Sequence, residues 1–237
     1  MAVSSIKALT FDVFGTVVDW RNSVAREAEA ILGDEGISVD GQAFALAWRA
    51  QYQPSMEEIR AGRRAFAKLD ILHRENLLTV LDSIGIKGVK DEVIVHLNKA
   101  WHRLDPWPDV LDGLHRLKKN FILATLSNGN VALMVNMAKK AGLPWDVVLG
   151  AEVAGAYKPD PNAYRNAITL LDLQPSACLM VAAHNDDLVA ASEAGMKTAF
   201  VCRPNEYGPD QTKDQKADHA FDFVASDFED LADQLGV

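Results

Sequence analysis

The sequence predicts an α/β protein with two parts: a Rossmann-like, doubly wound parallel sheet core and an inserted helical cap domain. Three observations support this prediction. Short apolar runs of strand length alternate with helical stretches in the second half of the chain. Polar residues follow these runs, as expected at the strand ends of an open sheet. About a hundred residues separate the first run from the second, and they read as helical almost throughout.

The first apolar run, residues 6–11, has Lys7 as its only charged residue and predicts a buried strand that ends at Asp12. Four similar runs follow, at 121–126, 145–150, 178–183 and 198–202. Strands that alternate with helices imply a parallel sheet with right-handed crossovers. The carboxyl ends of these strands then share one edge of the sheet, where ligands of open α/β sheets bind.

Helices are predicted between these strands at 130–142, 161–172 and 186–195. Gly142 and Gly195 stand near the ends of the first and third of them, where glycine commonly stops a helix. Residues 203–219 are rich in Pro, Asp and Lys, so we expect a surface loop there. A last strand and helix are expected near 221–235.

We expect residues 20–100 to form the helical cap, inserted after the first strand, and residues 1–19 and 101–237 to form the core. Three segments of the insertion place apolar side chains on one helical face each. These side chains are Val24, Ala28, Ile31 and Leu32; Phe44, Ala47 and Trp48; and Leu69, Leu72, Leu77, Leu78 and Leu81. The proline-broken segment 104–110, LDPWPDV, is expected to return the chain to the core.

Composition narrows the class of protein. A chain of 237 residues that is 49% hydrophobic can bury a sizeable core. The formal charge of -9 disfavours nucleic acid and anionic membranes as partners and leaves a small molecule. No stretch approaches the roughly 20 apolar residues that span a bilayer, and no signal-peptide pattern is present, so a cytoplasmic location is expected. Cys178 and Cys202 lie in apolar runs and fit reduced core residues.

Polar side chains capable of chemistry follow the predicted strands. The first strand contributes Asp12 and Thr16. The later strand ends contribute Ser127, Asn128, Lys158, Tyr164, His184 and Asp187. Two carboxylates, a hydroxyl and an amine at one edge of a sheet suit covalent catalysis with an aspartate nucleophile.

Six motifs occur in order over nearly the whole chain: FDVFGTVVDW, AWRAQY, PWPDV, LSNGN, YKPDPNAY and RPNEYGP. In these motifs the sequence resembles the haloacid dehalogenase superfamily, and DVFGTVVDW, AWRAQ and SNGN resemble its type II, or L-2-haloacid, dehalogenases. The resemblance implies a hydrolase that acts on the carbon–halide bond of short (S)-2-haloacids or haloacetates. An aspartyl ester would be the intermediate, and a 2-hydroxyacid and halide the products. Members of the family often form homodimers.

The resemblance also implies residue roles. Asp12 matches the nucleophile, Thr16 its hydrogen-bonding neighbour and Lys158 its basic partner. Arg49 in the cap matches an arginine that binds halide and substrate, and Asp187 matches the acid of the fourth motif. The remaining implied contacts with substrate or halide are Val13, Phe14, Ser127, Asn128 and Tyr164.

Two positions depart from familiar patterns. Phosphatases of the superfamily carry Asp-x-Asp, and Phe14 replaces the second acid, which protonates a leaving alcohol. A departing halide needs no proton, so Phe14 favours dehalogenation. In the fourth motif, Ala182 and His184 stand where type II enzymes often have Ser and Asn. Either Asp187 or His184 could therefore activate the hydrolytic water.

Two other functions remain open from the sequence alone. Asp186 and Asp187 resemble a magnesium motif, which suits a magnesium-dependent small-molecule phosphatase. Without that alternative, no metal and no cofactor are expected. A catalytically silent binding domain of the same fold is the other possibility. Four intact residues argue against it: Asp12, Ser127, Lys158 and Asp187.

Overall fold

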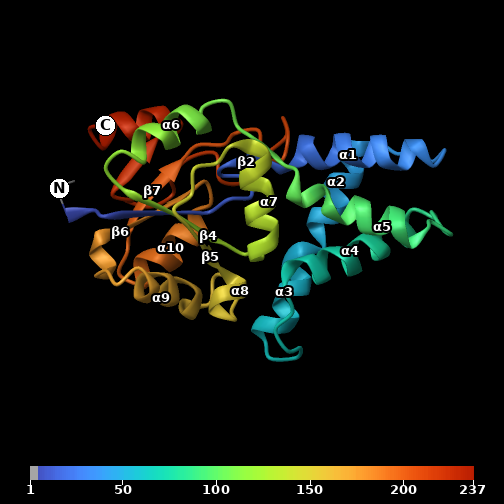
Figure 1. Cartoon of the computed structure of the whole chain (residues 1–237), viewed down its shortest axis with the longest axis horizontal. Coiled ribbons are helices and arrows are strands. Elements are labelled where there is room, and N and C mark those ends of the chain that lie inside the picture. The colour runs from blue at the N-terminus through green and yellow to red at the C-terminus, as the bar shows by residue number, and fades with distance from the viewer. Residues whose placement is uncertain (1–4) are drawn as a thin grey trace.

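The core is a six-stranded parallel sheet with strand order β5-β4-β1-β6-β7-β8 in a computed structural model that describes residues 5–237 (Figure 1). Its strands are β1 (Ala8–Phe11), β4 (Ile122–Ser127), β5 (Val147–Gly150), β6 (Cys178–Ala182), β7 (Lys197–Val201) and β8 (Phe223–Ala225). The order confirms the predicted doubly wound sheet. The chain reverses its direction of winding on either side of β1, so the carboxyl end of β1 lies at the topological switch point, where ligands bind.

Helices cover both faces of the sheet, giving three layers (Figure 1). They are α6 (Val110–Leu117), α7 (Val131–Ala141), α8 (Ala151–Ala154), α9 (Pro161–Leu170), α10 (Asn185–Glu193) and α11 (Phe228–Gln234), with a short 3₁₀ turn η3 (Pro175–Ala177). Alternation along β1 supplies both cores: Leu9 and Phe11 pack with the side of α6 and α11, whereas Thr10 faces the side of α9 and α10. Helix α7 ends, as predicted, at Gly142, whose φ of 72° is left-handed.

The insertion is helical, as predicted, and lies beyond the carboxyl edge of the sheet (Figure 1). Its elements are α1 (Trp20–Asp34), α2 (Gly41–Ala50), α3 (Tyr52–Arg60), α4 (Leu69–Ser83), α5 (Asp91–Asn98) and the 3₁₀ turn η2 (Lys99–His102). A short antiparallel pair, β2 (Val18–Asp19) with β3 (Asp105–Pro106), joins the outgoing and returning chain segments. The division into a cap of residues 20–100 and a core stays a prediction, although the helices begin and end close to these bounds.

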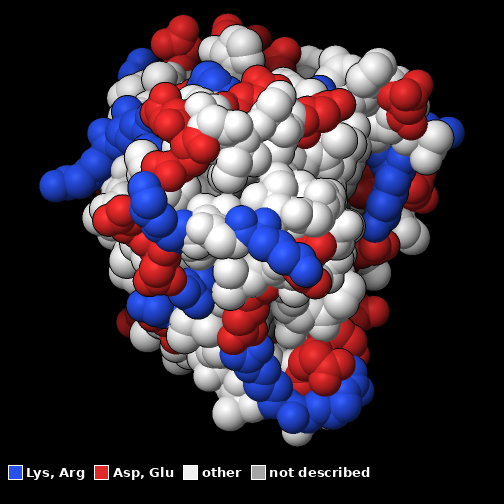
Figure 2. All heavy atoms as spheres, turned by 90° about the vertical axis from the view of Figure 1, so that its right-hand side faces the viewer, with Lys and Arg blue, Asp and Glu red and all other residues white. Residues whose placement is uncertain are grey.

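The surface at the cap end mixes acidic and basic side chains (Figure 2). Several of the cap arginines form exposed ion pairs, such as Arg63 with Glu58 at 2.9 Å and Arg64 with Glu75 at 2.6 Å. Acidic and basic side chains therefore alternate on the face shown in Figure 2. That nucleic acid is not a partner stays a prediction. No helix within residues 5–237 combines the length and the apolar character that crossing a bilayer requires.

The prediction that residues 203–219 form a surface loop is wrong for several of their side chains. Arg203 is buried, and its guanidinium donates two hydrogen bonds of 2.8 Å to Asp109 and one of 2.9 Å to the carbonyl of Thr16. Glu206 and Asp214 are buried as well. Composition suggested exposure, but these polar side chains have partners in the core, so the segment folds inward over the edge of the sheet.

Asp70 connects cap helix α4 to the core. Its carboxylate contacts His102 Nε2 at 2.7 Å and accepts a hydrogen bond from Lys99 Nζ at 2.8 Å. Asn130, just before α7, donates to Asp70 Oδ2 at 3.2 Å and accepts from the Asp70 backbone N–H at 3.1 Å. Burial opposes the charge, but the hydrogen bonds from His102 and Lys99 hold the pKa of Asp70 well below its ordinary value.

Asp70→Asn should therefore destabilise the protein in a pH-dependent way. The native pKa of Asp70 lies below the unfolded value of about 4, so its contribution is complete above that value and is lost as the pH falls. We expect the variant to lose roughly 2 kcal/mol of unfolding free energy near pH 7, and the loss to shrink as pH falls from about 5 to 3. Urea unfolding across this interval measures it, and a pH-independent loss would contradict the assignment.

Candidate active site

Asp12 follows β1 directly, and its backbone N–H donates to the Val181 carbonyl of β6 at 3.0 Å. The residue is 7% exposed, and its side chain has three polar partners. Oδ1 accepts from Lys158 Nζ at 2.9 Å. Oδ2 accepts from Thr16 Oγ1 at 2.8 Å and contacts His184 Nδ1 at 3.1 Å. The carboxylate is therefore held on both oxygens by donors from distant parts of the chain.

The charge of Asp12 is stabilised despite burial. Desolvation alone would raise its pKa, but the charge of Lys158 and the hydrogen bond and charge of His184 hold that pKa far below its ordinary value. Thr16 Oγ1 accepts a 2.9 Å hydrogen bond from the Ala183 N–H, which leaves its own hydrogen directed at Asp12. Asp12 is consequently an ionised carboxylate, the state that a nucleophile requires.

Lys158 connects Asp12 to a second carboxylate. Its ammonium group also bonds Asp187 Oδ2, and Tyr164 Oη donates to Asp187 Oδ1 at 2.6 Å. Burial is the largest influence on Asp187 and raises its pKa, with the neighbouring charge of Asp12 adding to the rise. The Lys158 backbone N–H donates to Asn128 Oδ1 at 2.8 Å, which ties the lysine segment to the end of β4.

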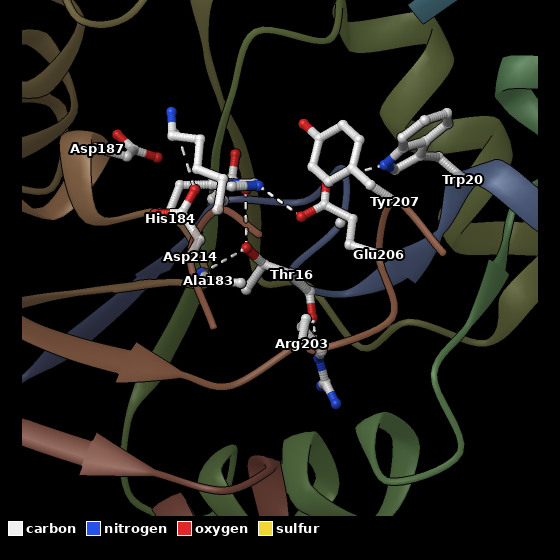
Figure 3. A network of polar contacts seen from close by, with 12 residues as sticks. Thr16, Trp20, Ala183, His184, Asp187, Arg203, Glu206, Tyr207 and Asp214 are labelled. Carbon is white, nitrogen blue, oxygen red and sulfur yellow. Dashed lines mark hydrogen bonds and ion pairs between the residues drawn. The ribbon is translucent and has the colours of Figure 1, made fainter. Parts of the chain in front are cut away.

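His184 lies between two carboxylates, and the second of them, Glu206, was not anticipated from the sequence. His184 Nε2 contacts Glu206 Oε2 at 2.8 Å, and Trp20 Nε1 donates to Glu206 Oε1 at 2.9 Å. In Figure 3 Glu206 lies between His184 and Trp20. The motif RPNEYGP contains Glu206 and Tyr207, and it was the one signal that could have drawn attention to them.

Arg49 reaches the site from α2 and lies among aromatic rings. Its Cζ atom is 4.0 Å from the ring centroid of Tyr52, 5.3 Å from that of Trp20 and 5.8 Å from that of Phe14. Its Nη1 is buried and has no hydrogen-bond partner within the described residues. A buried guanidinium N–H without a partner is costly, so the position suits an anionic ligand.

These groups surround a cavity of about 420 Å³ between cap and core. Of the residues predicted from the sequence, its walls contain Asp12, Phe14, Arg49, Asn128, Lys158, Tyr164, His184 and Asp187. Lining residues that sequence reasoning missed are Tyr52, Gln53, Arg60, Pro159, Tyr207, Lys213 and Asp214; Asp186 also lines the cavity. Most of the predicted residues therefore meet in one place.

Three predicted residues do not line the cavity. Thr16 acts on Asp12 directly, as described above. Ser127 is buried, and its Oγ accepts from the Gly129 N–H at 3.1 Å. Val13 is buried in the core, and its carbonyl accepts from the N–H groups of Val17 and Val18 in the turn after β1. Substrate contacts from Ser127 and Val13 stay predictions.

The magnesium alternative does not fit this arrangement. The Asp186 side chain is 82% exposed and pairs with Lys213 at 2.9 Å. Asp12 and Asp187 are instead bridged by Lys158, whose ammonium group forms an ion pair with each of them. Within residues 5–237, His, Cys, Asp and Glu side chains form no group of three that could hold a metal ion. The paired aspartates therefore do not supply the oxygen-ligand set that magnesium requires.

Comparison with known proteins gives the class of this protein. The family model for haloacid dehalogenase-like hydrolases matches residues 6–195, so the chain belongs to that family. The chain is 30% identical over 214 residues to (S)-2-haloacid dehalogenase 4A of Burkholderia cepacia, covering 86% of this chain and 88% of that protein. The branch predicted from the motifs is confirmed.

Similar solved structures belong to the same branch of the family. The crystal structure of the defluorinating L-2-haloacid dehalogenase Rha0230 shares 46% identity and a TM-score of 0.96, covering 98% of this chain and 96% of that one. The L-2-haloacid dehalogenase PA0810 shares 45% identity and a TM-score of 0.94, covering 97% and 98%. At these identities and coverages, the likeness extends to nearly every element that carries the site.

Two histidines of this region, the half-buried His184 and the buried His73, are in opposite environments. Burial would lower the pKa of His184, but the charges and hydrogen bonds of Glu206 and Asp12 raise it well above the ordinary value. His73 lies 4.4 Å from the Trp101 ring, and neither of its nitrogens has a hydrogen-bond partner within the described residues. Burial lowers the pKa of His73 to about 3.

We therefore expect His184 to be an imidazolium and His73 a neutral imidazole near pH 7. Ring ¹⁵N chemical shifts in the resting protein distinguish the two states, and each signal is assigned by its loss in His184→Gln or His73→Gln. Because the pKa of His184 is raised, its extra proton stabilises the fold at lower pH and is lost as pH rises. A neutral His184 at pH 7 would contradict this reading of the site.

Proposed function

We propose that the protein hydrolyses short L-2-haloacids and haloacetates to 2-hydroxyacids and halide through an ester on Asp12. The observation that carries the proposal is that the ionised Asp12 carboxylate and the unpartnered guanidinium N–H of Arg49 line the same cavity. A nucleophile and an anion-binding group are the two parts that displacement of a halide needs.

In the first step, one oxygen of Asp12 attacks the carbon that bears the halogen. We assign the attack to Oδ1, because it accepts one hydrogen bond whereas Oδ2 has two partners. The new bond joins Oδ1 to carbon, the carbon–halogen bond breaks with its electron pair on the halide, and the carbon inverts. Arg49 Nη1 is the donor available to that halide.

The aromatic walls favour this step. Phe14 and Tyr52 are buried beside Arg49, and the ring of the buried Trp20 is centred 5.3 Å from its Cζ atom. A halide that leaves toward these aromatic rings interacts more strongly with the guanidinium than it would in water, because the rings displace water on that side. A second acid at position 14 would have no proton to deliver to a halide, so Phe14 suits dehalogenation.

In the second step, water attacks Cγ of the Asp12 ester. Asp187 is the proposed base. Its pKa is raised, and it lies close to Asp12, because the Lys158 ammonium group bonds both carboxylates. Asp187 takes one water proton and passes it to the departing alkoxide when the Cγ–Oδ1 bond breaks. The second water proton leaves from the new Asp12 carboxyl group to solvent, which restores the ionised nucleophile.

The remaining expectations belong with this proposal. The small-molecule partner is the 2-haloacid itself, and Asn128 and Tyr164 on the cavity wall are available to contact it. A homodimer and a cytoplasmic location stay predictions.

A panel of substrates tests the function. We expect halide release from L-2-chloropropionate and from fluoro-, chloro- and bromoacetate, little from the D enantiomer, and no phosphate release from small phosphate esters. Halide in the medium is measured against an Asp12→Asn control, which keeps the shape of the side chain but removes the nucleophile. Absence of halide release from the entire panel would reject the dehalogenase and favour a binding domain.

Oxygen labelling tests the ester. In a single turnover in H₂¹⁸O, the product should carry ordinary oxygen from Asp12, and the label should enter the peptide that contains Asp12. Mass spectrometry of product and peptide measures both. Label in the product of the first turnover, with none in the peptide, would show direct attack by water.

Arg49→Lys tests the halide site. Lysine keeps the charge but loses the planar fork that stacks on Tyr52, so we expect kcat/KM to fall at least about tenfold, or about 1.4 kcal/mol. Steady-state kinetics measures the change. Arg63→Lys, at an exposed cap arginine, is the matched control and should leave kcat/KM unchanged. Equal kinetics in the two variants would remove Arg49 from the mechanism.

A further inference from the structure

We propose that Glu206 is a positioning residue for the second half of the reaction: it holds His184 as a cationic hydrogen-bond donor to Asp12 Oδ2 while Asp12 is an ester. The inference rests on the proposed function and adds a residue to it. Glu206 contacts neither substrate nor reacting atoms in this scheme and acts through His184.

Glu206 is fixed by its surroundings. It is 1% exposed, and its two oxygens have separate partners, Trp20 Nε1 on Oε1 and His184 Nε2 on Oε2 (Figure 3). The carboxylate also packs on the backbone at Gly15, where φ is +88° and a Cβ atom would lie 2.1 Å from Oε1. A glycine at this position both permits the turn after β1 and leaves room for the carboxylate.

In the resting site, His184 has a carboxylate on each side. Both ring nitrogens must donate when Asp12 and Glu206 are ionised. The other charged groups nearby are Lys158, on the far oxygen of Asp12, and Arg49, whose charge interacts with both Glu206 and Asp12. The two carboxylates that contact the ring directly therefore stabilise the positive charge of His184, which the two nearby cations oppose.

Formation of the ester removes one of these carboxylates. Asp12 becomes neutral when Oδ1 bonds to carbon, so Glu206 is then the one carboxylate that directly contacts His184 among the described residues. Oδ2 becomes the carbonyl oxygen of the ester, with Thr16 Oγ1 and His184 Nδ1 still directed at it.

Thr16 Oγ1 and His184 Nδ1 both contact Oδ2, the atom on which negative charge develops in the next step. When water adds to Cγ, the carbonyl electron pair moves onto Oδ2, and on collapse it returns as the Cγ–Oδ1 bond breaks. Preorganised donors on such an oxygen lower the barrier, and the loss of one typically costs about 10²–10³ in rate. A neutral glutamine at 206 could hydrogen bond to His184 but could not hold its second proton.

The rate of ester formation, the first half of the reaction, should not depend on the effect of Glu206 on His184. The bond from His184 draws electron density from the Asp12 carboxylate, so weakening it does not make Oδ1 a poorer nucleophile. The proposal therefore separates the two chemical steps. Loss of the Glu206 charge should slow breakdown of the ester and leave its formation nearly unchanged.

Glu206→Gln is examined in a single turnover with L-2-chloropropionate and enzyme in excess. Samples are quenched over time, halide is measured, and the peptide that contains Asp12 is analysed by mass spectrometry for the carboxyethyl ester. We expect halide release within about threefold of the wild-type rate and ester decay slowed at least about tenfold, so that the ester accumulates. Glu229→Gln, an exposed glutamate of α11, is the charge-matched control and should behave as wild type.

Two further variants separate positioning from a structural role. Glu206→Asp keeps the charge and should decay at an intermediate rate. His184→Gln should also accumulate ester. The double variant that combines Glu206→Gln with His184→Gln should show no slower ester decay than His184→Gln alone, because both changes remove the same hydrogen-bond donor. A purely structural role of Glu206 would instead give additive losses and no rescue by aspartate.

The proposal is overturned if Glu206→Gln slows halide release and ester decay equally, or if its ester decays at the wild-type rate. If Glu206→Gln does not fold, the rate of ester decay in His184→Gln and Glu206→Asp decides the matter: wild-type decay in both overturns it. A wild-type protein that releases no halide on the whole panel would instead reject the proposed function, which is a distinct result.

Discussion

The structure depends on a group of neighbouring charged side chains at the carboxyl end of β1, three of which belong to buried residues. The group contains three carboxylates and three cations: Asp12, Asp187, Glu206, Lys158, His184 and Arg49. A buried charge without a partner is strongly destabilising, so each member restricts where the others can lie. Lys158 lies between two aspartates and His184 between an aspartate and a glutamate, which leaves one oxygen of Asp12 with a single hydrogen bond.

The cap contributes Arg49 to this group. Arg49 is the cation whose guanidinium retains an unpartnered N–H, and aromatic rings of core and cap surround it. The sheet places Asp12 on the cavity wall, and the inserted helices place Arg49 and Tyr52 there. Neither part contains the whole cavity. The Asp70 cluster, which ties α4 to the start of α7, fixes the distance between them.

Much of this organisation was predictable from local sequence. The apolar run before Asp12, the glycine after α7 and the long helical insertion each leave a signal within a few residues, because strand alternation, helix periodicity and positive φ are local properties. The order of polar residues after the strands predicted most of the cavity wall, because parallel strands bring their carboxyl ends to one edge. Burial is less local: the resemblance implied a substrate contact for Val13, and the structure shows that this residue is fully buried and does not line the cavity.

By itself, the sequence determined the doubly wound core, the position of Asp12 at its switch point and the absence of a second acid at Phe14. Only the tertiary structure decided that Glu206 joins the site. Its segment looked like an exposed loop, since Pro, Asp and Lys give no periodicity. Its partner Trp20 lies 186 residues away, and contacts of such separation are set by packing of the whole domain, which no local pattern encodes.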